Sequence, residues 1–204
     1  MLARAVVVKV VFLKKNCSML TKTKQTWLVV GIVLLALVLD QWSKIYIKTH
    51  FELGEAREVF SWFWIVFVEN NGMAFGIEWF SKLLLTLFRI VAVGVIGWYI
   101  HTLIHKQTVR TGYLATVAMV IAGALGNIID CVCYGKIWGY ADWFHGKVVD
   151  MLYFPLIRNA AGEVLFFRPV FNIADSFITV AVLLIIIFYR KDLDASLAGV
   201  GKRK

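Results

Sequence analysis

The amino-acid sequence predicts an all-α polytopic membrane protein with four transmembrane helices. The first observation is composition, since hydrophobic residues make up 60% of the 204 residues and charged residues only 17%. The second is that the apolar residues gather into four runs of bilayer-spanning length, which is about 20 residues each. With 2 Pro and 3 Cys, the chain is neither a proline-rich linker nor a disulfide scaffold.

The predicted spans are separated by connections of unequal length. Spans two and three are joined by a short turn at 105–111, whereas the connections at 50–80 and 131–169 are longer than most connections in compact domains. Long connections of this kind often carry function. The spans themselves are expected at 27–47, 83–104, 113–129 and 170–189.

Basic residues near the span ends predict the orientation. Residues 1–25 hold six Lys and Arg residues and no acidic residue, whereas the loop 50–80 holds five Glu and one Arg. Because Lys and Arg accumulate on the cytoplasmic side, both termini are expected in the cytoplasm and both long loops outside it. The organisation is a basic segment 1–25, a membrane domain 26–190 with outward loops 50–80 and 131–169, and a basic tail 191–204.

The net charge of +9 follows largely from this topology. The positive charge also attracts the chain to anionic membrane lipids. Basic and aromatic residues are not interleaved in the way that would indicate a nucleic-acid partner. Residues 2–13 lack a small-residue cleavage site, so no cleaved signal peptide is expected, and Met19 is a second candidate start.

Three of the four predicted spans contain Asp, Lys or Arg residues, which are costly in hydrocarbon and are therefore candidates for function. Asp40 and Lys44 are four residues apart in span one and share a helix face, which suits an interfacial ion pair that anchors the helix end. Arg89 lies about two turns inside span two. Its side chain either extends to the interface or pairs with a carboxylate in the bundle, and its position favours neither.

Two Asn-x-x-Asp units occur at the outer ends of spans three and four. Asn127 and Asp130 form the first unit, and Asn172 and Asp175 form the second. Each unit places an amide and a carboxylate on one helix face, and the two units lie at the same depth. Taken alone, Asn172 suits a helix N-cap and Asp175 a first-turn carboxylate.

A further aspartate, Asp150, follows two valines in the second long loop and on position alone would be an ordinary loop charge. Paired aspartates can hydrolyse a peptide bond without a metal, because one carboxyl keeps its proton while the other activates water. Metal binding is disfavoured, since His101 and His105 have no third ligand in the sequence. No metal and no organic cofactor is therefore expected.

Five motifs occur in order along residues 27–190. They are Asp40-Gln41-x-Ser43-Lys44, Asn70-Asn71-Gly72-Met73-Ala74-Phe75, Gly123-Ala124-Leu125-Gly126-Asn127-Ile128-Ile129-Asp130, Val148-Val149-Asp150 and Phe171-Asn172-Ile173-Ala174-Asp175. This order resembles the lipoprotein signal peptidases, also called signal peptidase II. The resemblance implies an aspartic endopeptidase of the bacterial inner membrane. Its substrates would be diacylglyceryl-modified prolipoproteins, cleaved just before the lipidated cysteine.

The resemblance also implies roles for individual residues. Asp150 and Asp175 would be the catalytic dyad, in place of the ordinary loop charge that position alone suggests for Asp150. The first outward loop would form a small β-cradle on the membrane surface, and the Val, Ile, Phe and Trp residues of 58–67 suit its strands. The enzyme would act as a monomer in contact with membrane lipids. The implied pocket residues are Asp40, Lys44, Asn70, Gly72, Asn127, Asp130 and Asn172.

The chain departs from the family pattern at two places. Cys131 stands where an Arg commonly follows the Gly-Asn-x-x-Asp motif, and we hypothesise that Arg89 supplies this charge from another helix. The gap between Asp130 and Asp150 is about double the usual one. The insert, 134–145, is rich in aromatic residues, which suits an interfacial lid and an ordinary aromatic belt equally well.

Two other functions compete with the peptidase hypothesis. A non-enzymatic transporter subunit would use the membrane carboxylates as a proton or ion relay. A different intramembrane aspartyl protease is disfavoured, because the sequence contains no Gly-x-Gly-Asp.

Overall fold

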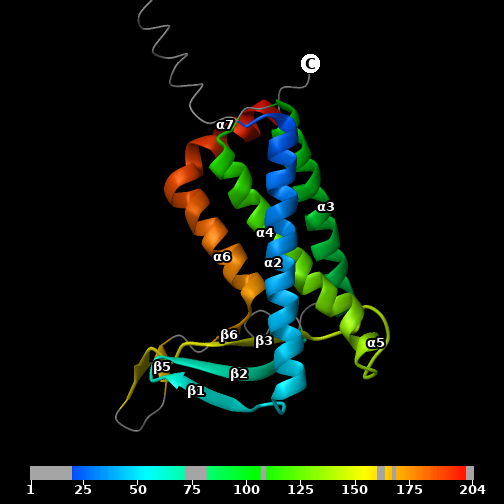
Figure 1. The fold of residues 1–204 in the computed structure, drawn as a ribbon, viewed down its shortest axis with the longest axis vertical. Helices are drawn as coiled ribbons and strands as arrows, with labels where there is room; N and C mark the ends of the chain where they lie inside the picture. Colours follow the sequence, from blue (N-terminus) through cyan, green and yellow to red (C-terminus); the bar gives the residue numbers. More distant parts are fainter. Residues whose placement is uncertain (1–19, 72–81, 107–108, 160–163, 167–168, 201–204) are drawn as a thin grey trace, which may run out of the picture.

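The computed structural model describes residues 20–71, 82–106, 109–159, 164–166 and 169–200. In these ranges, four helices have the length and apolar composition to cross a membrane, which confirms the four predicted spans. They run side by side, and a small sheet lies across one end of them (Figure 1). The helices are α2 (Lys22–His50), α3 (Lys82–Lys106), α4 (Thr111–Ile129) and α6 (Ile173–Leu184).

The fourth span differs from the prediction at both ends. Helix α6 begins at Ile173 rather than at residue 170, because Val170–Phe171 form strand β6 and Asn172 caps the helix. At the other end, the helix continues through a π-helical turn, Ile185–Tyr189, into helix α7 (Arg190–Val200). Part of the predicted basic tail is therefore helical.

The sheet is antiparallel and has the strand order β1-β2-β3-β6. Strands β1 (Ala56–Phe60) and β2 (Phe63–Asn70) form a hairpin in the first long loop, which confirms the strands expected at 58–67. Strand β3 (Val148–Tyr153) comes from the second long loop and pairs with β2. A second, two-stranded sheet is formed by β4 (Ile157–Arg158) and β5 (Val164–Phe166).

Aromatic side chains gather on the part of the sheet away from α2. Stacked and tilted ring contacts join residues of the hairpin to Phe154, which follows β3, and Phe154 in turn stacks on Phe171 of β6. Aromatic rings with one apolar and one wet side suit a membrane–water interface. The cluster consists of Phe60, Trp62, Phe63, Phe154 and Phe171.

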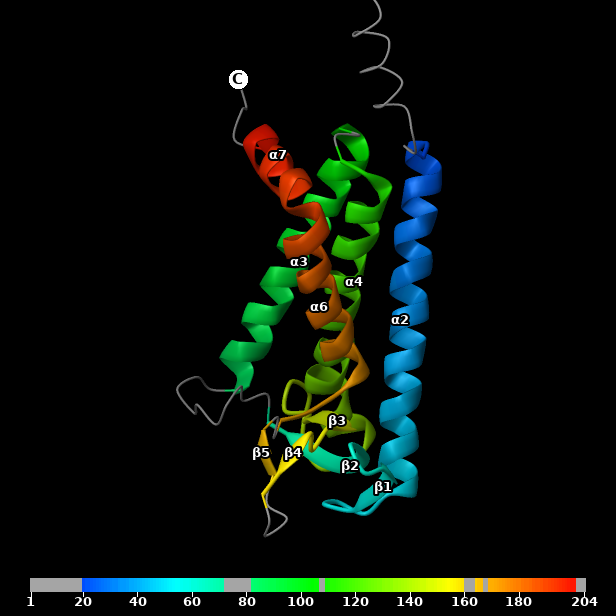
Figure 2. The same ribbon diagram turned by 90° about the vertical axis from the view of Figure 1, so that its left-hand side faces the viewer.

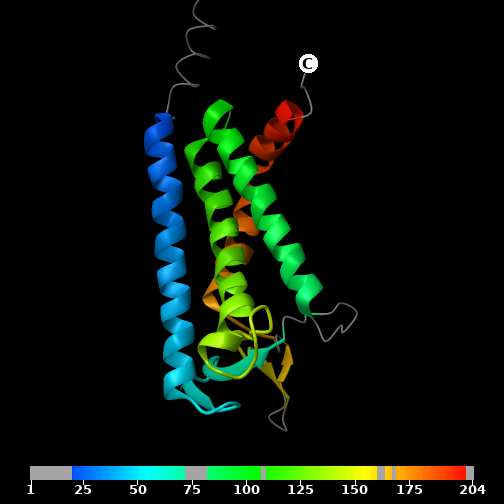
Figure 3. The ribbon, with the colours of Figure 1, turned by 90° about the vertical axis from the view of Figure 1, so that its right-hand side faces the viewer.

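Helix α4 lies between α2 and α6 and packs closely against both. A Cβ atom on Gly126 would lie 2.5 Å from Asp40 Oδ2, and one on Gly123 would clash with the Ala174 carbonyl oxygen. The absence of side chains on these two glycines therefore lets three helices meet at the sheet end. Helix α3 is different, since it diverges from α4 toward that end (Figures 2 and 3).

The outer surface of the helices is apolar, whereas two clusters of buried side chains lie at opposite ends of the bundle. Large side chains such as Leu35, Phe88 and Ile187 are more than half exposed, as expected for lipid-facing helices. One cluster joins α3, α4 and the final helical segment away from the sheet. The other seals the end of α2 onto the sheet and contains Ile47, Phe51, Phe67, Tyr134, Val149 and Met151.

Candidate active site

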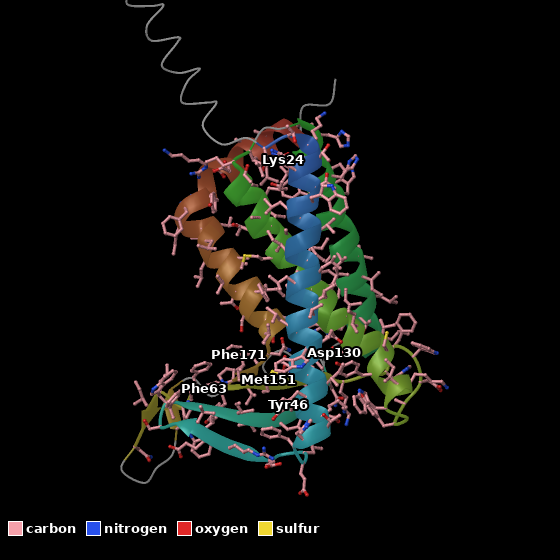
Figure 4. The ribbon with its side chains drawn as sticks, viewed as in Figure 1. Lys24, Tyr46, Phe63, Asp130, Met151 and Phe171 are labelled. Atoms are coloured by element: carbon pink, nitrogen blue, oxygen red, sulfur yellow. The ribbon has the colours of Figure 1, made fainter. Side chains whose placement is uncertain are left out.

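The predicted site residues gather where the helices meet the sheet. Figure 4 shows Asp130, Met151 and Phe171 at this level, and Lys24 at the opposite end of α2. Polar side chains from several helices and strands meet here, and three carboxylates, Asp40, Asp130 and Asp150, are at most 2% exposed. Buried carboxylates require partners, and the contacts below supply them.

Lys44 is the centre of a buried ion cluster. Its Nζ lies 2.9 Å from Asp40 Oδ2 and 2.8 Å from Asp130 Oδ2, and the Lys44 side chain is completely buried. The interpretation of Asp40 and Lys44 as an interfacial pair is therefore wrong, although the pair itself forms. The spacing within one helix could not reveal Asp130, which reaches the same cation from the end of another helix.

Gln41 is a site residue that the sequence analysis did not single out. Its Nε2 donates to Asp130 Oδ1 at 2.9 Å and to Asp40 Oδ2 at 3.0 Å, and its Oε1 accepts from the Tyr134 hydroxyl. The amide thus joins the two carboxylates that Lys44 neutralises. A polar residue next to Asp40 in a predicted span was the available signal.

Helix α4 opens at Asp130 into a π-helical turn, Asp130–Tyr134. Turns of this kind often accompany functional sites. The chain returns at Gly146, whose amide donates to the Cys131 carbonyl oxygen at 2.9 Å. A Cβ at Gly146 would overlap the Asp130 carbonyl oxygen, so only glycine fits this return. Asp130 Oδ2 also accepts from the Val149 amide at 3.3 Å, which ties the turn to strand β3.

Asp150 lies in the middle of β3 and is held by two amide side chains. Asn172 Nδ2 donates to Asp150 Oδ1 at 2.7 Å, and Asn70 Nδ2 donates to Asp150 Oδ2 at 3.1 Å. Burial raises the pKa of Asp150, the nearby Asp175 charge raises it further, and the pKa reaches about 7. Asp150 thus keeps its proton to a pH at which an ordinary carboxyl has lost it.

Asp175 lies in the first turn of α6 and is only partly buried. Asn127 Nδ2 donates to Asp175 Oδ1 at 2.8 Å, while Asn127 Oδ1 accepts from Lys44 Nζ and from Asn172 Nδ2. The amides of Asn172 and Asn127 therefore connect Asp150 to Asp175. Both Asn-x-x-Asp units take part in one network, as their common depth indicates.

The start of α6 is fixed by two caps. Asn172 Oδ1 accepts from the Asp175 amide at 2.9 Å, and Asp40 Oδ1 accepts from the Ala174 amide at 2.9 Å. The first is the helix N-cap that the residue type alone suggests, so Asn172 caps its helix and holds Asp150 at the same time.

Arg89 and Gly72 differ from the other candidate residues. Arg89 Nη1 lies 3.1 Å from the Cys131 sulfur, so its guanidinium reaches the position at which this chain lacks an arginine. Within the described ranges, no ion pair joins Arg89 to a carboxylate. Gly72 lies outside the described residues.

The described residues contain no group of three His, Cys, Asp or Glu side chains arranged to hold a metal ion. What they contain instead is a pair of linked carboxylates, one with a raised pKa and one partly open, at the end of a membrane helix bundle. Such a pair can activate water and polarise a peptide carbonyl. The fold and the site define a membrane aspartic endopeptidase.

Comparison with known proteins agrees with this class. The family model described as Signal peptidase (SPase) II matches residues 32–190. A lipoprotein signal peptidase of Porphyromonas gingivalis is 41% identical over 89% of this chain and 91% of its own length. One of Amoebophilus asiaticus is 35% identical over 84% of this chain and 81% of its own length.

A solved structure described as a bacterial membrane enzyme superposes with a TM-score of 0.61 at 28% identity, over 86% of this chain and 92% of that one. The chain belongs to the signal peptidase II family, and it is a multi-pass bacterial membrane enzyme with aspartic endopeptidase activity. This membership favours the peptidase over a transporter subunit with a carboxylate relay.

Proposed function

We propose that the enzyme removes signal peptides from diacylglyceryl-modified bacterial prolipoproteins, with Asp150 and Asp175 as its catalytic dyad. The observation that carries the proposal is the amide bridge, in which Asn172 and Asn127 connect the two carboxylates. The bridge leaves one carboxyl buried with a raised pKa and the other partly open. This asymmetry suits a dyad in which the two carboxyls play different parts.

In the proposed reaction, water attacks the carbonyl carbon of the residue before the lipidated cysteine. The Asp175 carboxylate accepts a proton from the water, and the Asp150 carboxyl donates its proton to the carbonyl oxygen. The tetrahedral intermediate then breaks its C–N bond as Asp175 passes the proton that it took from water to the leaving nitrogen. The Asp150 carboxylate takes back a proton from a hydroxyl group of the intermediate, so both carboxyls return to their starting states. Asn70 and Asn172 hold the Asp150 carboxyl in position through these changes of charge.

The remaining polar residues support the dyad in this proposal. Lys44, Asp40 and Asp130 fix α2 and α4 against α6. Asn127 holds the Asp175 carboxylate through its side-chain amide. Gly72 is proposed to line the pocket. Arg89 is proposed to provide the cation beside residue 131, and full cleavage activity in an Arg89→Gln variant would contradict that role.

The site is proposed to lie near the outer face of the bacterial inner membrane, with both termini in the cytoplasm. The excess of Lys and Arg in residues 1–25 supports this orientation. A monomer would receive its substrate laterally, with the signal helix among the spans and the diacylglyceryl chains in the surrounding lipid. The exposed apolar faces of the helices are compatible with this entry.

The proposal is tested with purified full-length enzyme and one prolipoprotein prepared with and without its diacylglyceryl group. We expect cleavage of the lipidated form alone, immediately before the lipidated cysteine, as mass spectrometry of the products would report. Equal cleavage of both forms would contradict the proposed substrate. Absence of any cleavage, combined with ion flux in vesicles that depends on Asp150, would support the relay instead.

A further inference from the structure

A second charged cluster lies on the face of the sheet opposite Asp150. Side chains alternate along a strand, so Glu69 and Asn70 of β2 point to opposite faces. Asn70 holds Asp150, whereas the Glu69 carboxylate forms ion pairs with Lys48 of α2 and with Lys147, one residue before β3. The side chains of Lys48 and Glu69 are 8% and 12% exposed, so water screens their ion pair little.

Lys48 also contacts the aromatic insert 134–145. Its Nζ lies 5.3 Å from the Trp138 ring centre and 5.2 Å from that of Tyr140. The ring centre of Phe67, in β2, lies 5.5 Å from the same Nζ. The Tyr140 hydroxyl accepts from the Lys147 amide at 2.8 Å. These contacts fasten the insert to α2 and to the start of β3, so the Trp138–Tyr140 part of the insert is anchored in this state.

Glu69 is well placed to act on the dyad through the sheet. Glu69 is paired with Val149, and Asn70 with Val148, so Lys147 and Glu69 join the two strands next to the Asn70–Asp150 hydrogen bond. Burial raises the pKa of Glu69, but hydrogen bonds from Lys48 and Lys147 outweigh it and hold the pKa below its usual value. The carboxylate therefore stays ionised and paired across the neutral range.

We propose that Lys48, Glu69, Lys147 and Tyr140 form a clasp that positions Asn70 against Asp150. These are positioning residues, because none of them contacts the proposed dyad. The expected effect of the clasp on cleavage depends on the proposed function, whereas its expected effect on the pairing of β2 with β3 does not. It also assigns the insert a role, since the insert supplies the Tyr140 side of the clasp.

The test compares Lys48→Met, Glu69→Gln and Tyr140→Phe with Lys48→Arg and Glu58→Gln. The first three remove a charge or a hydroxyl from the clasp and keep most of the side-chain volume. Lys48→Arg keeps the charge and its contact with the rings. Glu58→Gln is the matched control, because Glu58 is an exposed glutamate on the same sheet.

With the lipidated prolipoprotein, we expect Lys48→Met and Glu69→Gln to lower kcat about tenfold with KM within about twofold, because the dyad is displaced while the substrate still binds. Lys48→Arg should restore most of kcat. A weakened Asn70 hydrogen bond would raise the pKa of Asp150. The charged groups that also act on this pKa are Asp175, which raises it, and Lys44, which lowers it. The alkaline limb of the kcat profile should therefore move to higher pH, which a loss of stability alone would not produce.

Hydrogen exchange provides a second readout that needs no activity. The amides of residues 148–150 should exchange faster in Lys48→Met, Glu69→Gln and Tyr140→Phe than in the wild type and in Glu58→Gln. If the wild type cleaves and the three variants match it in kcat, pH profile and exchange, the clasp is wrong. A raised KM with unchanged kcat and exchange would also overturn it. If the wild type does not cleave, the proposed function fails, and exchange alone decides on the clasp.

Discussion

The side-chain amide of Asn172 donates to Asp150 across 2.7 Å, from the residue that caps helix α6 to the middle of strand β3. The same side chain accepts the Asp175 backbone amide through its oxygen. A single residue therefore fixes the start of the last membrane helix, the position of one aspartate and the backbone of the other.

This double role predicts that helix capping and activity separate at position 172. Serine is also a good N-cap, but it has no amide to donate to Asp150 and Asn127, so Asn172→Ser should keep the cap and lose about 1–3 kcal/mol of stability for the buried acceptors left without this donor. Its cleavage rate should fall about 10-fold to 100-fold, because Asp150 loses one of the two side-chain amides that hold it in position. Asn172→Ala should lose about 1 kcal/mol of stability in addition. Thermal unfolding and the cleavage rate measure the two effects, and full activity in Asn172→Ser would contradict the role.

Lys44 is predicted to be essential for folding. Lys44→Met removes the cation that two buried carboxylates share, and breaking such a cluster costs about 3–5 kcal/mol. Lys24→Met is the matched control, because Lys24 is an exposed lysine at the far end of the same helix. We expect a large fall in Tm for the first variant and almost none for the second. Equal melting temperatures would show that the cluster contributes little.

The close approach of α4 to its neighbours predicts the effect of added methyl groups. Gly123→Ala and Gly126→Ala would place a Cβ against the Ala174 carbonyl and the Asp40 carboxylate, at a cost of about 1–3 kcal/mol each. Gly94→Ala in α3 meets nothing within 4 Å and should be neutral or stabilising by up to about 1 kcal/mol. Thermal unfolding of the three variants tests these expectations. A lower Tm for Gly94→Ala, with no change for Gly123→Ala and Gly126→Ala, would contradict them.

The raised pKa of Asp150 predicts a pH dependence of stability. The pKa is about 7 in the folded protein against 3.8 for the free group, so the folded state binds the proton more tightly. This stabilisation is complete below about pH 3.8 and is lost as the pH rises through about 7. Asp150→Asn, which does not titrate, should therefore lose less Tm between about pH 4 and about pH 8 than the wild type does. A difference independent of pH would contradict the raised pKa.

Much of this architecture could be predicted from the sequence because its signals are local. The apolar runs define four helices, and the spacing of Asn172 and Asp175 places both on one face of the last one. The β-branched and aromatic residues of 58–67 likewise indicated strands.

The contacts that complete the site join distant parts of the chain and have no local signal. Asp130 begins the π-helical turn that follows α4, and its carboxylate pairs with Lys44 of α2. Gln41 contacts Asp130 across the same interface. The pairing of β3 with β2, which places Asp150 beside Asn70, joins two separate loops. Spacing within one helix predicts the Asp40–Lys44 pair correctly but favours a pair at the membrane interface, because burial depends on neighbouring elements.

The central claim is that Asp150 and Asp175 act together in peptide-bond hydrolysis, and single-turnover cleavage of the lipidated prolipoprotein by Asp150→Asn and Asp175→Asn tests it most directly. Asparagine preserves the shape of each side chain and removes the proton exchange, so variants that remain folded isolate the chemistry. We expect both variants to remain folded at neutral pH while losing cleavage by at least about 1000-fold. Cleavage by either folded variant at a rate close to that of the wild type would contradict the account.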